Sequence, residues 1–282
     1  MQDNQYLMES REESLRLDKK TDAGSVKRHA LWAGIKPGMR VADLGCGSGI
    51  TTSMLHQLVQ PGGEVVGLDI SAERIEYANA HYLTDGIRFV QGDNLEPLDH
   101  LGSFDFIHVR FVLEYYRKNS FEMVKNIVKI LKPGGILCLI DLDNNCLNHH
   151  DLPDRLRRTI VASIEAFRLK ANFDPYVGKK LYSFLYDLQF EDIDVAVSGH
   201  HLIWGELKES DAFNWLKKIE VAPRKINYQF DEYEGGYPEF LKEFKAFFND
   251  PRRFTYSPII CCRGLKRNVA KYRQPLLGPL RT

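Results

Sequence analysis

Three glycines at alternate positions follow a short apolar run near residue 41. The segment reads VADLGCGSG, with Gly45, Gly47 and Gly49 after a carboxylate at Asp43. Glycine lets the backbone turn sharply, and the missing Cβ lets a ligand approach main-chain N–H groups at the start of the next helix. The dinucleotide fingerprint G-x-G-x-x-G would need glycine where Ile50 stands. The spacing therefore predicts a ligand-binding turn of another class.

Two aspartates stand where carboxylates could hold a nucleoside. Asp69 ends an apolar run in GLDIS, 20 residues after Gly49, and Asp93 stands in QGDNLEPL after a later apolar run. A carboxylate at the end of the second strand of a nucleotide-binding unit can accept hydrogen bonds from both ribose hydroxyls. Aspartate also caps helices and forms turns, so a structural role for either residue stays open.

The elements that must position these residues alternate between short apolar runs and helical patterns. We expect strands over 40–44, 64–69, 87–91, 104–109 and 136–141, with helices over 50–59, 71–82 and 121–131. This alternation is typical of βαβ units on a parallel sheet. Every strand-to-helix turn then lies at the carboxyl edge of the sheet, where ligands bind in open α/β folds.

The pattern changes after residue 143, where strands become rare. We expect helices over 151–170, 178–188, 209–220 and 237–248, and strands over 193–197 and 254–263. A cap inserted among the last strands is expected at about 145–189 and 203–250 of a domain spanning 37–265, with a helical flap at 1–36 and a basic tail at 266–282. The aromatic residues of the cap could line a pocket for an organic substrate or pack the cap on the sheet.

Four features in register resemble the class I S-adenosylmethionine-dependent methyltransferases. They are the glycine motif, the two aspartates, the segment FDFIHVRFVLEYY from Phe104, and LKPGG from Leu131. The resemblance covers residues 27–143 best and is closest to the small-molecule branch of ubiquinone and menaquinone biosynthesis. It implies an α/β fold with a Rossmann-like, seven-stranded, mostly parallel sheet, helices on both faces and a helical substrate cap. It also implies S-adenosylmethionine as cofactor and methyl transfer to a small organic acceptor, mainly by proximity and orientation.

The resemblance extends to individual positions of the cofactor site. An acidic residue at the place of Asp93 accepts from the adenine amino group in the family, and the next side chain, here Asn94, lies beside the ring. The backbone at Arg110 is expected to meet the methionine part, and Arg16 or Lys20 could reach its carboxylate. The residues expected to bind the cofactor are Asp43, Gly45, Cys46, Gly47, Gly49, Asp69, Ile70, Asp93, Asn94 and Arg110.

One dipeptide raises the question of a metal-dependent reaction. Asp143-Asn144, after the fifth strand, looks like half of the metal site of catechol-type methyltransferases. That site also needs a carboxylate after the fourth strand, where Arg110 stands and would repel Mg²⁺. We therefore expect no metal.

Candidates for acid–base chemistry are few. His149 and His150 could remove a proton from the acceptor, and Tyr115 could orient it. Because methyl transfer can proceed by position alone, His149→Ala and His150→Ala are each expected to retain most of the turnover.

Length, charge and cysteine count limit the remaining function classes. The chain has 282 residues, 38 basic against 38 acidic side chains, and five cysteines without C-x-x-C spacing. No apolar run approaches the ~18 residues of a membrane span, and the polar first residues lack a signal-peptide core. We therefore expect a cytoplasmic protein with no global field that attracts nucleic acid.

Two alternatives to a small-molecule methyltransferase stay open. A non-catalytic regulator or partner subunit would bind S-adenosylmethionine without turnover, and an RNA methyltransferase would use the basic tail. The chain from residue 251 onward carries eight cations and no acidic residue, while six acidic residues just upstream can neutralise it. The acceptor, the methylated atom and the oligomeric state are not fixed by the sequence.

Overall fold

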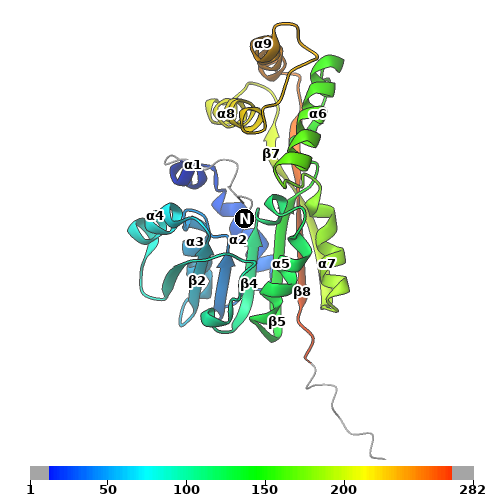
Figure 1. Cartoon of the computed structure of the whole chain (residues 1–282). Coiled ribbons are helices and arrows are strands. Elements are labelled where there is room, and N and C mark those ends of the chain that lie inside the picture. Colours follow the sequence, from blue (N-terminus) through cyan, green and yellow to red (C-terminus); the bar gives the residue numbers. More distant parts are fainter. Residues whose placement is uncertain (1–12, 269–282) are drawn as a thin grey trace, which may run out of the picture.

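A single mixed sheet forms the centre of the structure, with helices on both faces (Figure 1). The computed structural model describes residues 13–268. The strands run in the order β3-β2-β1-β4-β5-β8-β6, and β7 also pairs with β8. Strands β1 to β5 are parallel, whereas β8 is antiparallel to β5, β6 and β7. The strands are β1 (Arg40–Leu44), β2 (Glu64–Asp69), β3 (Ile87–Gln91), β4 (Phe104–Arg110), β5 (Leu131–Leu142), β6 (Asn148–His149), β7 (Glu191–Ile203) and β8 (Thr255–Leu265).

Two hydrophobic clusters cover the two faces of this sheet. Helices α5 and α7 pack on one face, and α2 and α3 pack on the other, while α4 lies against β3. Among residues 13–268, no helix combines the length and hydropathy that crossing a bilayer requires. The helices are α1 (Glu13–Lys20), α2 (Ala23–Ala33), α3 (Ile50–Val59), α4 (Ala72–Tyr82), α5 (Ser120–Lys129), α6 (Asp154–Lys170), α7 (Leu181–Asp187), α8 (Glu209–Lys225) and α9 (Gly236–Asn249).

The structure confirms the predicted fold class, and its first half follows the predicted elements closely. Strands β1, β2 and β3 and helix α3 have the predicted bounds. Helix α4 begins after Ser71, whose hydroxyl accepts a hydrogen bond from the Arg74 N–H. This is the N-cap that the sequence predicts, because a serine oxygen satisfies an amide that has no partner inside the helix.

The second half departs from the predicted strands. Strand β7 has 13 residues rather than five because it pairs with β8 along almost its whole length. Most side chains of β7 are polar or exposed, so the strand lacks the apolar run by which the sequence would predict its full length. Strand β5 begins at Leu131, which already pairs with Phe104 across an irregular register. The two-residue strand β6 makes eight strands where seven were predicted.

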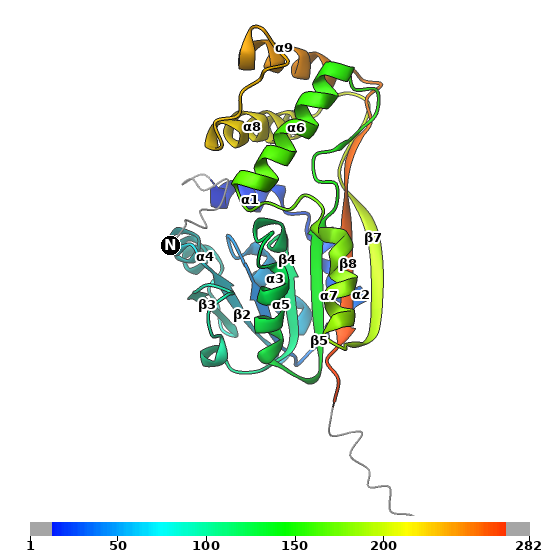
Figure 2. The same cartoon turned by 45° about the vertical axis from the view of Figure 1, so that its right-hand side comes forward.

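Helices α6, α8 and α9 form a separate layer beyond the carboxyl edge of the sheet, here called the cap (Figure 2). Strands β7 and β8 run from the sheet up to it. The cap has its own core, so most of its aromatic residues pack against one another. The buried members of this core are Leu156, Ile160, Ile203, Trp215, Tyr233, Phe240, Phe244, Phe247 and Phe248.

Two helices lie on the sheet rather than in the predicted cap and flap. Helix α7 falls within the predicted cap segment 145–189, yet Leu181 and Leu185 belong to the sheet cluster. Helix α2 falls within the predicted flap 1–36, yet Ala30 and Ala33 pack on the other face of the sheet. Both helices carry apolar faces that only the sheet can bury. Residues 1–12 of the flap and 269–282 of the tail lie outside the described residues.

His149 lies inside the cap core. Its ring makes edge contacts with Trp215 and Phe247, at centroid distances of 5.2 and 5.9 Å. Its nitrogens lie 2.9 Å from the Thr255 hydroxyl and 3.1 Å from the Cys146 carbonyl. Burial lowers the pKa of His149 to about 4, so the ring is neutral at pH 7. The histidine therefore joins β6 and β8 to the cap as a packed, uncharged group.

We expect Phe244→Ala to loosen the cap selectively. Phe244 is fully buried and stacks on Phe248 at 4.6 Å, and removing a buried phenyl ring costs about 3–5 kcal/mol. Hydrogen exchange should accelerate in α6, α8 and α9 while β1 to β5 keep their protection. Phe213→Ala is the matched control, because Phe213 is 57% exposed and its loss should leave exchange unchanged. Equal acceleration in the sheet would show that the two cores are not separate.

The buried His149 should make the fold acid-sensitive. Its pKa is near 6.5 in the unfolded chain and about 4 in the fold, so the unfolded state takes up the proton first as the pH falls. The free energy of unfolding should therefore drop by about 2 kcal/mol between pH 7 and pH 5 from this residue alone. His149→Gln should flatten the pH dependence in urea denaturation, and His150→Gln, on the exposed neighbour, should not. An unchanged slope in His149→Gln would contradict a neutral buried ring.

Candidate functional site

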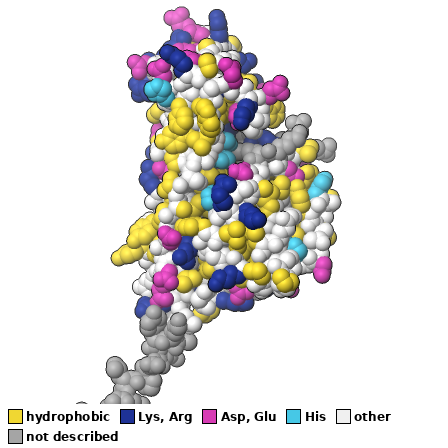
Figure 3. Space-filling model, turned by 180° about the vertical axis from the view of Figure 1, so that it is seen from behind, with side chains coloured by type: hydrophobic (Ala, Val, Ile, Leu, Met, Phe, Trp, Pro, Cys, Tyr) yellow, Lys and Arg dark blue, Asp and Glu magenta, His cyan; other side chains and the backbone are white. Residues whose placement is uncertain are grey.

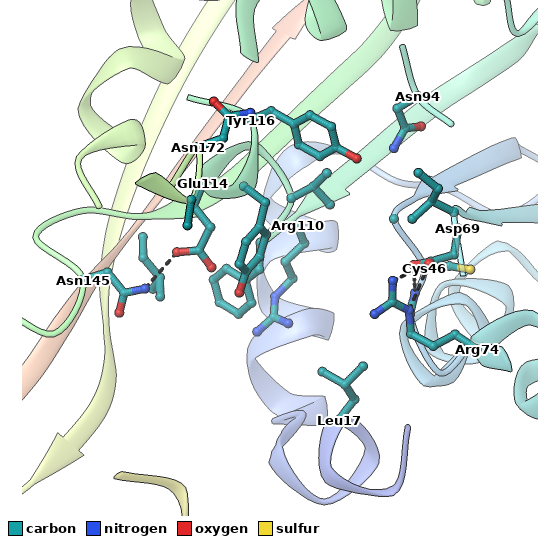
Figure 4. Close-up of a pocket in the computed structure, with 18 of the residues that line it drawn as sticks. Leu17, Cys46, Asp69, Arg74, Asn94, Arg110, Glu114, Tyr116, Asn145 and Asn172 are labelled. Atoms are coloured by element: carbon teal, nitrogen blue, oxygen red, sulfur yellow. Dashed lines mark hydrogen bonds and ion pairs between the residues drawn. The ribbon is translucent and has the colours of Figure 1, made fainter. Parts of the chain in front are cut away.

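A cavity of about 1010 Å³ opens at the carboxyl edge of the sheet. The turns after β1, β2 and β4 line it, helix α1 covers one side, and the ends of α6 and α8 reach it from the cap. Figure 4 shows the lining side chains converging from these elements. Pockets for one small ligand commonly measure roughly 300–1,000 Å³, so this space has room for two molecules side by side.

The glycine turn forms one wall of the cavity. The N–H groups of Gly45 and Cys46 donate to the Leu68 carbonyl at 2.7 and 2.9 Å, which ties the turn to β2. Gly45 has a φ of +84°, and a Cβ there would overlap the side chain of Val112. Gly47 has a φ of +57° and also lines the cavity. A ligand can therefore reach the backbone of the turn.

Asp69 lines the cavity from the end of β2. Its Oδ2 accepts from the Gly47 N–H at 2.9 Å, and its Oδ1 accepts from the Ser71 N–H at 3.0 Å. Oδ1 also forms a buried ion pair with Arg74 at 2.8 Å, which the sequence analysis did not foresee (Figure 4). Carboxylate oxygens have two lone pairs each, so Oδ2 keeps capacity for a ligand hydroxyl.

Three residues of the predicted cofactor set, Asp43, Gly49 and Asp93, do not line the cavity. Asp43 is 2% exposed, and it accepts from the Thr52 hydroxyl at 2.7 Å and bonds His108 at 3.0 Å. It therefore braces the glycine turn from beneath. Gly49 caps α3 with a φ of +89°, and a Cβ there would press on Ala78 at 2.8 Å. Helix packing therefore requires glycine at position 49, and contact with a ligand does not.

The structure presents Asn94 to the cavity in place of Asp93. The Asp93 carboxylate accepts from the Leu95 N–H at 2.9 Å, as a turn residue, and does not line the cavity. Asn94 is 6% exposed, lines the cavity, and its Oδ1 has no hydrogen-bond partner among the described residues. A buried amide oxygen in this state fits a ligand that donates a hydrogen bond, such as an amino group. Ile70, next to Asp69, also lines the cavity and is 38% exposed.

The second half of the cavity lies between the ends of β4 and β5 and the cap. Its polar pair is Glu114 and Asn145, joined by a hydrogen bond of 2.8 Å from the amide to Oε2. Apolar walls with a few placed polar groups are typical of sites for organic ligands. The apolar and aromatic residues of this half are Phe111, Val112, Tyr115, Tyr116, Leu142, Leu169, Ala171 and Ile226.

Arg110 stands between the two halves (Figure 4). Its guanidinium lies over the Phe111 ring, 4.0 Å from the centroid, and its Nε has no hydrogen-bond partner among the described residues. Burial lowers the pKa of Arg110 to about 10, which leaves the side chain charged at neutral pH. A largely buried guanidinium of this kind fits a carboxylate, which it can bind through two parallel hydrogen bonds.

The structure separates the three catalytic candidates. Tyr115 lines the cavity, and its ring lies 5.9 Å from that of Phe173. His149 lies in the cap core, and His150 is exposed, with its N–H donating to the Phe254 carbonyl. Neither histidine lines the cavity, so neither is placed to take a proton from a bound ligand.

Glu114, which no motif in the sequence marks, lies in the second half of the cavity. A single glutamate in FVLEYY belongs to no motif, and only the fold shows that it is buried. Arg16 of α1 also lines the cavity, whereas the side chain of Lys20 lies outside the described ones.

The dipeptide considered as half of a metal site is engaged within the protein. Asp143 lies 3.6 Å from the Lys179 ammonium, and its Oδ2 accepts from the Asn144 amide at 3.0 Å. Among residues 13–268, no group of three or more His, Cys, Asp or Glu side chains is arranged to hold a metal ion.

The first half of the cavity fits the adenosine and methionine parts of S-adenosylmethionine. Asp69 and Asn94 offer acceptors for hydroxyl and amino groups, and Gly45 and Gly47 line the cavity. Arg110 offers a cation for a carboxylate. These are the donor and acceptor types that the cofactor requires.

Comparisons with known proteins agree with this chemistry. A family model described as "Methyltransferase domain" matches residues 35–184. The demethylmenaquinone methyltransferase of Lactococcus lactis subsp. lactis is 30% identical over 228 residues, which cover 77% of this chain and 79% of that relative.

Two solved structures share the fold. The YcgJ protein of Bacillus subtilis has a TM-score of 0.58 at 19% identity, over 88% of this chain and 100% of that one. The phosphoethanolamine N-methyltransferase 2 of Haemonchus contortus, in complex with S-adenosyl-L-methionine, has a TM-score of 0.54 at 14% identity, over 91% of this chain and 56% of that one. The chain therefore belongs to the class I S-adenosylmethionine-dependent methyltransferases, in the quinone-type branch, and it transfers the methyl group of S-adenosylmethionine to a small molecule.

Proposed function

We propose that the methyl acceptor is an organic ring compound of the quinone type, bound between the ends of β4 and β5 and the cap. The aromatic side chains of Phe111, Tyr115 and Tyr116 in the second half of the cavity carry this proposal. The aromatic half matches a flat organic ring in chemistry and lies beside the half that fits the cofactor. The name of the Lactococcus lactis relative, a demethylmenaquinone methyltransferase, supports the same class of acceptor.

The cofactor is assigned to the half formed by the glycine turn. Asp69 Oδ2 would accept from the ribose, and Asn94 Oδ1 would accept from the adenine amino group, in place of the Asp93 carboxylate expected from the sequence. Arg110 would bind the methionine carboxylate, helped by Arg16 of α1. The cofactor methyl would then point toward the aromatic half.

The reaction needs little beyond this arrangement. S-adenosylmethionine supplies a methyl group on a sulfonium, whose sulfur leaves as a neutral thioether. The walls of the cavity hold the acceptor in line with that methyl group, and such positioning can contribute roughly 7–11 kcal/mol to lowering the barrier. Tyr115 and Tyr116 orient the ring, and burial lets the acceptor react without water around it.

The cap would act as a lid over the acceptor. The end of α6 at residues 169–172 and the end of α8 at 225–227 reach the cavity from the cap side. The cap core is separate from the sheet cores. The Arg117 and Lys118 N–H groups donate to Asn172 at the end of α6, so the cap would move about this joint with the turn after β4. Lids of this kind exclude water when the substrate is bound.

A cytoplasmic enzyme with no nucleic-acid substrate fits the remaining features. All five cysteines are free, as in a reducing compartment. Several cations of the C-terminal region are engaged within the fold: Arg252 pairs with Asp250, Arg267 pairs with Glu191, and the Lys266 ammonium donates to the Val128 and Leu131 carbonyls. On the face seen in Figure 3, basic and acidic side chains are interspersed, so that face presents no broad positive field.

The first test concerns cofactor affinity. Asp69→Asn removes a charged acceptor, and Asn94→Ala removes the buried amide oxygen, so each should weaken S-adenosylhomocysteine binding at least tenfold in calorimetry. A hydrogen bond to a charged group such as Asp69 contributes about 1.5–3 kcal/mol, and leaving a buried ligand donor unpaired opposite Asn94→Ala costs about 1–3 kcal/mol. Asp93→Asn is the matched control and should bind within about twofold of wild type. Loss in Asp93→Asn with full binding by Asn94→Ala would restore the assignment made from the sequence.

The second test concerns the lid. Hydrogen exchange should slow in residues 154–170 and 209–227 when S-adenosylhomocysteine and a short-chain demethylmenaquinol are both bound. Mobile lids belong to the less stable part of a fold, so exchange there should be fast in the free protein. Protection confined to residues 41–116 with both ligands present would rule out a lid.

A further inference from the structure

Glu114 is a buried carboxylate on the acceptor side of the cavity. We propose that it is the base that accepts the proton of a hydroxyl group on the methyl acceptor. This role rests on the proposed function, with the quinone-type acceptor bound in its reduced, hydroxyl-bearing form.

Position is the first support. Glu114 lies in the short 3-10 turn Leu113–Tyr115 that follows β4, is 3% exposed and lines the cavity. Among the described residues that line the cavity, the carboxylates are Asp69 and Glu114. Asp69 is committed to Arg74 and the glycine turn on the cofactor side. Glu114 is therefore the carboxylate that faces the acceptor.

Rigid placement is the second support. The Glu114 Oε2 accepts from the Asn145 amide at 2.8 Å, and the Glu114 carbonyl accepts from the Asp174 N–H at 2.7 Å. The Glu114 N–H donates to Asp141 Oδ2 at 3.3 Å. Side chain and backbone are thus both held, and a base fixed in this way needs no rearrangement when the acceptor arrives.

A second carboxylate lies behind Glu114. Asp141 is fully buried near the end of β5, and burial together with the negative charge of Glu114 raises its pKa well above the ordinary range. A neutral Asp141 does not oppose a negative charge on Glu114, whereas an ionised one would. The Asn145 amide donates a hydrogen bond to Glu114 Oε2 and stabilises a negative charge there.

The other charged groups of this half are cations. Lys118, Lys170, Lys218 and Lys225 line it together with Tyr115 and Tyr116. Burial raises the pKa of Tyr116 to about 12, so Tyr116 is a poor base at neutral pH. The positive charges of the lysines favour the oxyanion that forms when the acceptor gives up its proton.

The proton and electron balance closes without another reactant. The acceptor O–H bond breaks, its proton passes to Glu114, and the electron pair enters the conjugated ring. A ring carbon forms the new bond to the methyl carbon, while the pair of the broken carbon–sulfur bond stays on sulfur. The ring oxygen then takes the proton back from Glu114, and the Glu114 carboxylate so regenerated accepts the hydrogen of that ring carbon as a proton, which restores the aromatic hydroxyl. Glu114 gives this last proton to solvent when the product leaves.

The test compares Glu114→Gln with Asp143→Asn in the full chain. Asp143 is a buried carboxylate near the end of β5 that does not line the cavity, so its variant controls for loss of a buried charge. Three quantities are measured: S-adenosylhomocysteine affinity, affinity of that complex for 1-naphthol, and single-turnover methylation of a short-chain demethylmenaquinol between pH 6 and pH 10.

Glu114→Gln should bind S-adenosylhomocysteine within about twofold of wild type and 1-naphthol at least fivefold more weakly. Its single-turnover rate at pH 7 should fall at least ~100-fold, the lower range for a general base. The rate should then rise with pH toward the wild-type value, because a phenolic hydroxyl ionises by itself near pH ~10. A merely structural role for Glu114 gives no such rescue. Asp143→Asn should match wild type throughout.

Two outcomes separate this role from the proposed function. Turnover of the demethylmenaquinol by Glu114→Gln within tenfold of wild type at pH 7, or a rate loss that high pH does not restore, overturns the role of Glu114 and leaves the acceptor class intact. Wild-type protein that binds 1-naphthol through Glu114 but does not methylate the demethylmenaquinol overturns the acceptor class and leaves the base in place. Equal affinity of wild type and Glu114→Gln for 1-naphthol also contradicts the role of Glu114 as a base. Absence of 1-naphthol binding by wild type contradicts it as well.

Discussion

A buried carboxylate at the end of β1 holds together the elements that make the cofactor half of the cavity. Asp43 accepts from Thr52 in the first turns of α3 and bonds His108 in the middle of β4. The strand, the helix and the neighbouring strand are thus tied on either side of the glycine turn. The position of that turn fixes where Asp69 and Val112 meet it, and hence the shape of the cavity. A carboxylate buried without these partners would cost several kcal/mol, so this arrangement tolerates little change.

The parts of the structure that the sequence predicts are those governed by local rules. Gly45 and Gly47 need positive φ values, Ser71 caps α4, and β1 to β3 are short apolar runs. Each of these features is predicted by residues that are adjacent in the sequence. The structure places Asp43 and Gly49 behind the cavity wall, because a motif marks which residues recur together, whereas packing decides which of them face the cavity.

The remaining features depend on contacts between distant residues. The length of β7 is set by its pairing with β8, whose residues lie about sixty positions further along the chain. Glu114 meets Asn145 across 31 residues, and α7 belongs to the sheet because its apolar face matches β5 and β8. No local pattern contains this information. The acceptor half was for this reason harder to foresee than the cofactor half.

The place of β8 between β5 and β7 has a consequence for how the chain folds. Ile136 of β5 pairs with Leu265, so the strand that covers the edge of β5 is made after the whole cap has been synthesised. Until then β5 presents unpaired N–H and C=O groups, as any open sheet edge does. Pairing between strands far apart in the chain is slow. Until β8 pairs with it, the open edge of β5 can pair with a strand of another chain. Loss of the last twenty or so described residues would therefore leave the edge of β5 unpaired and prone to aggregation.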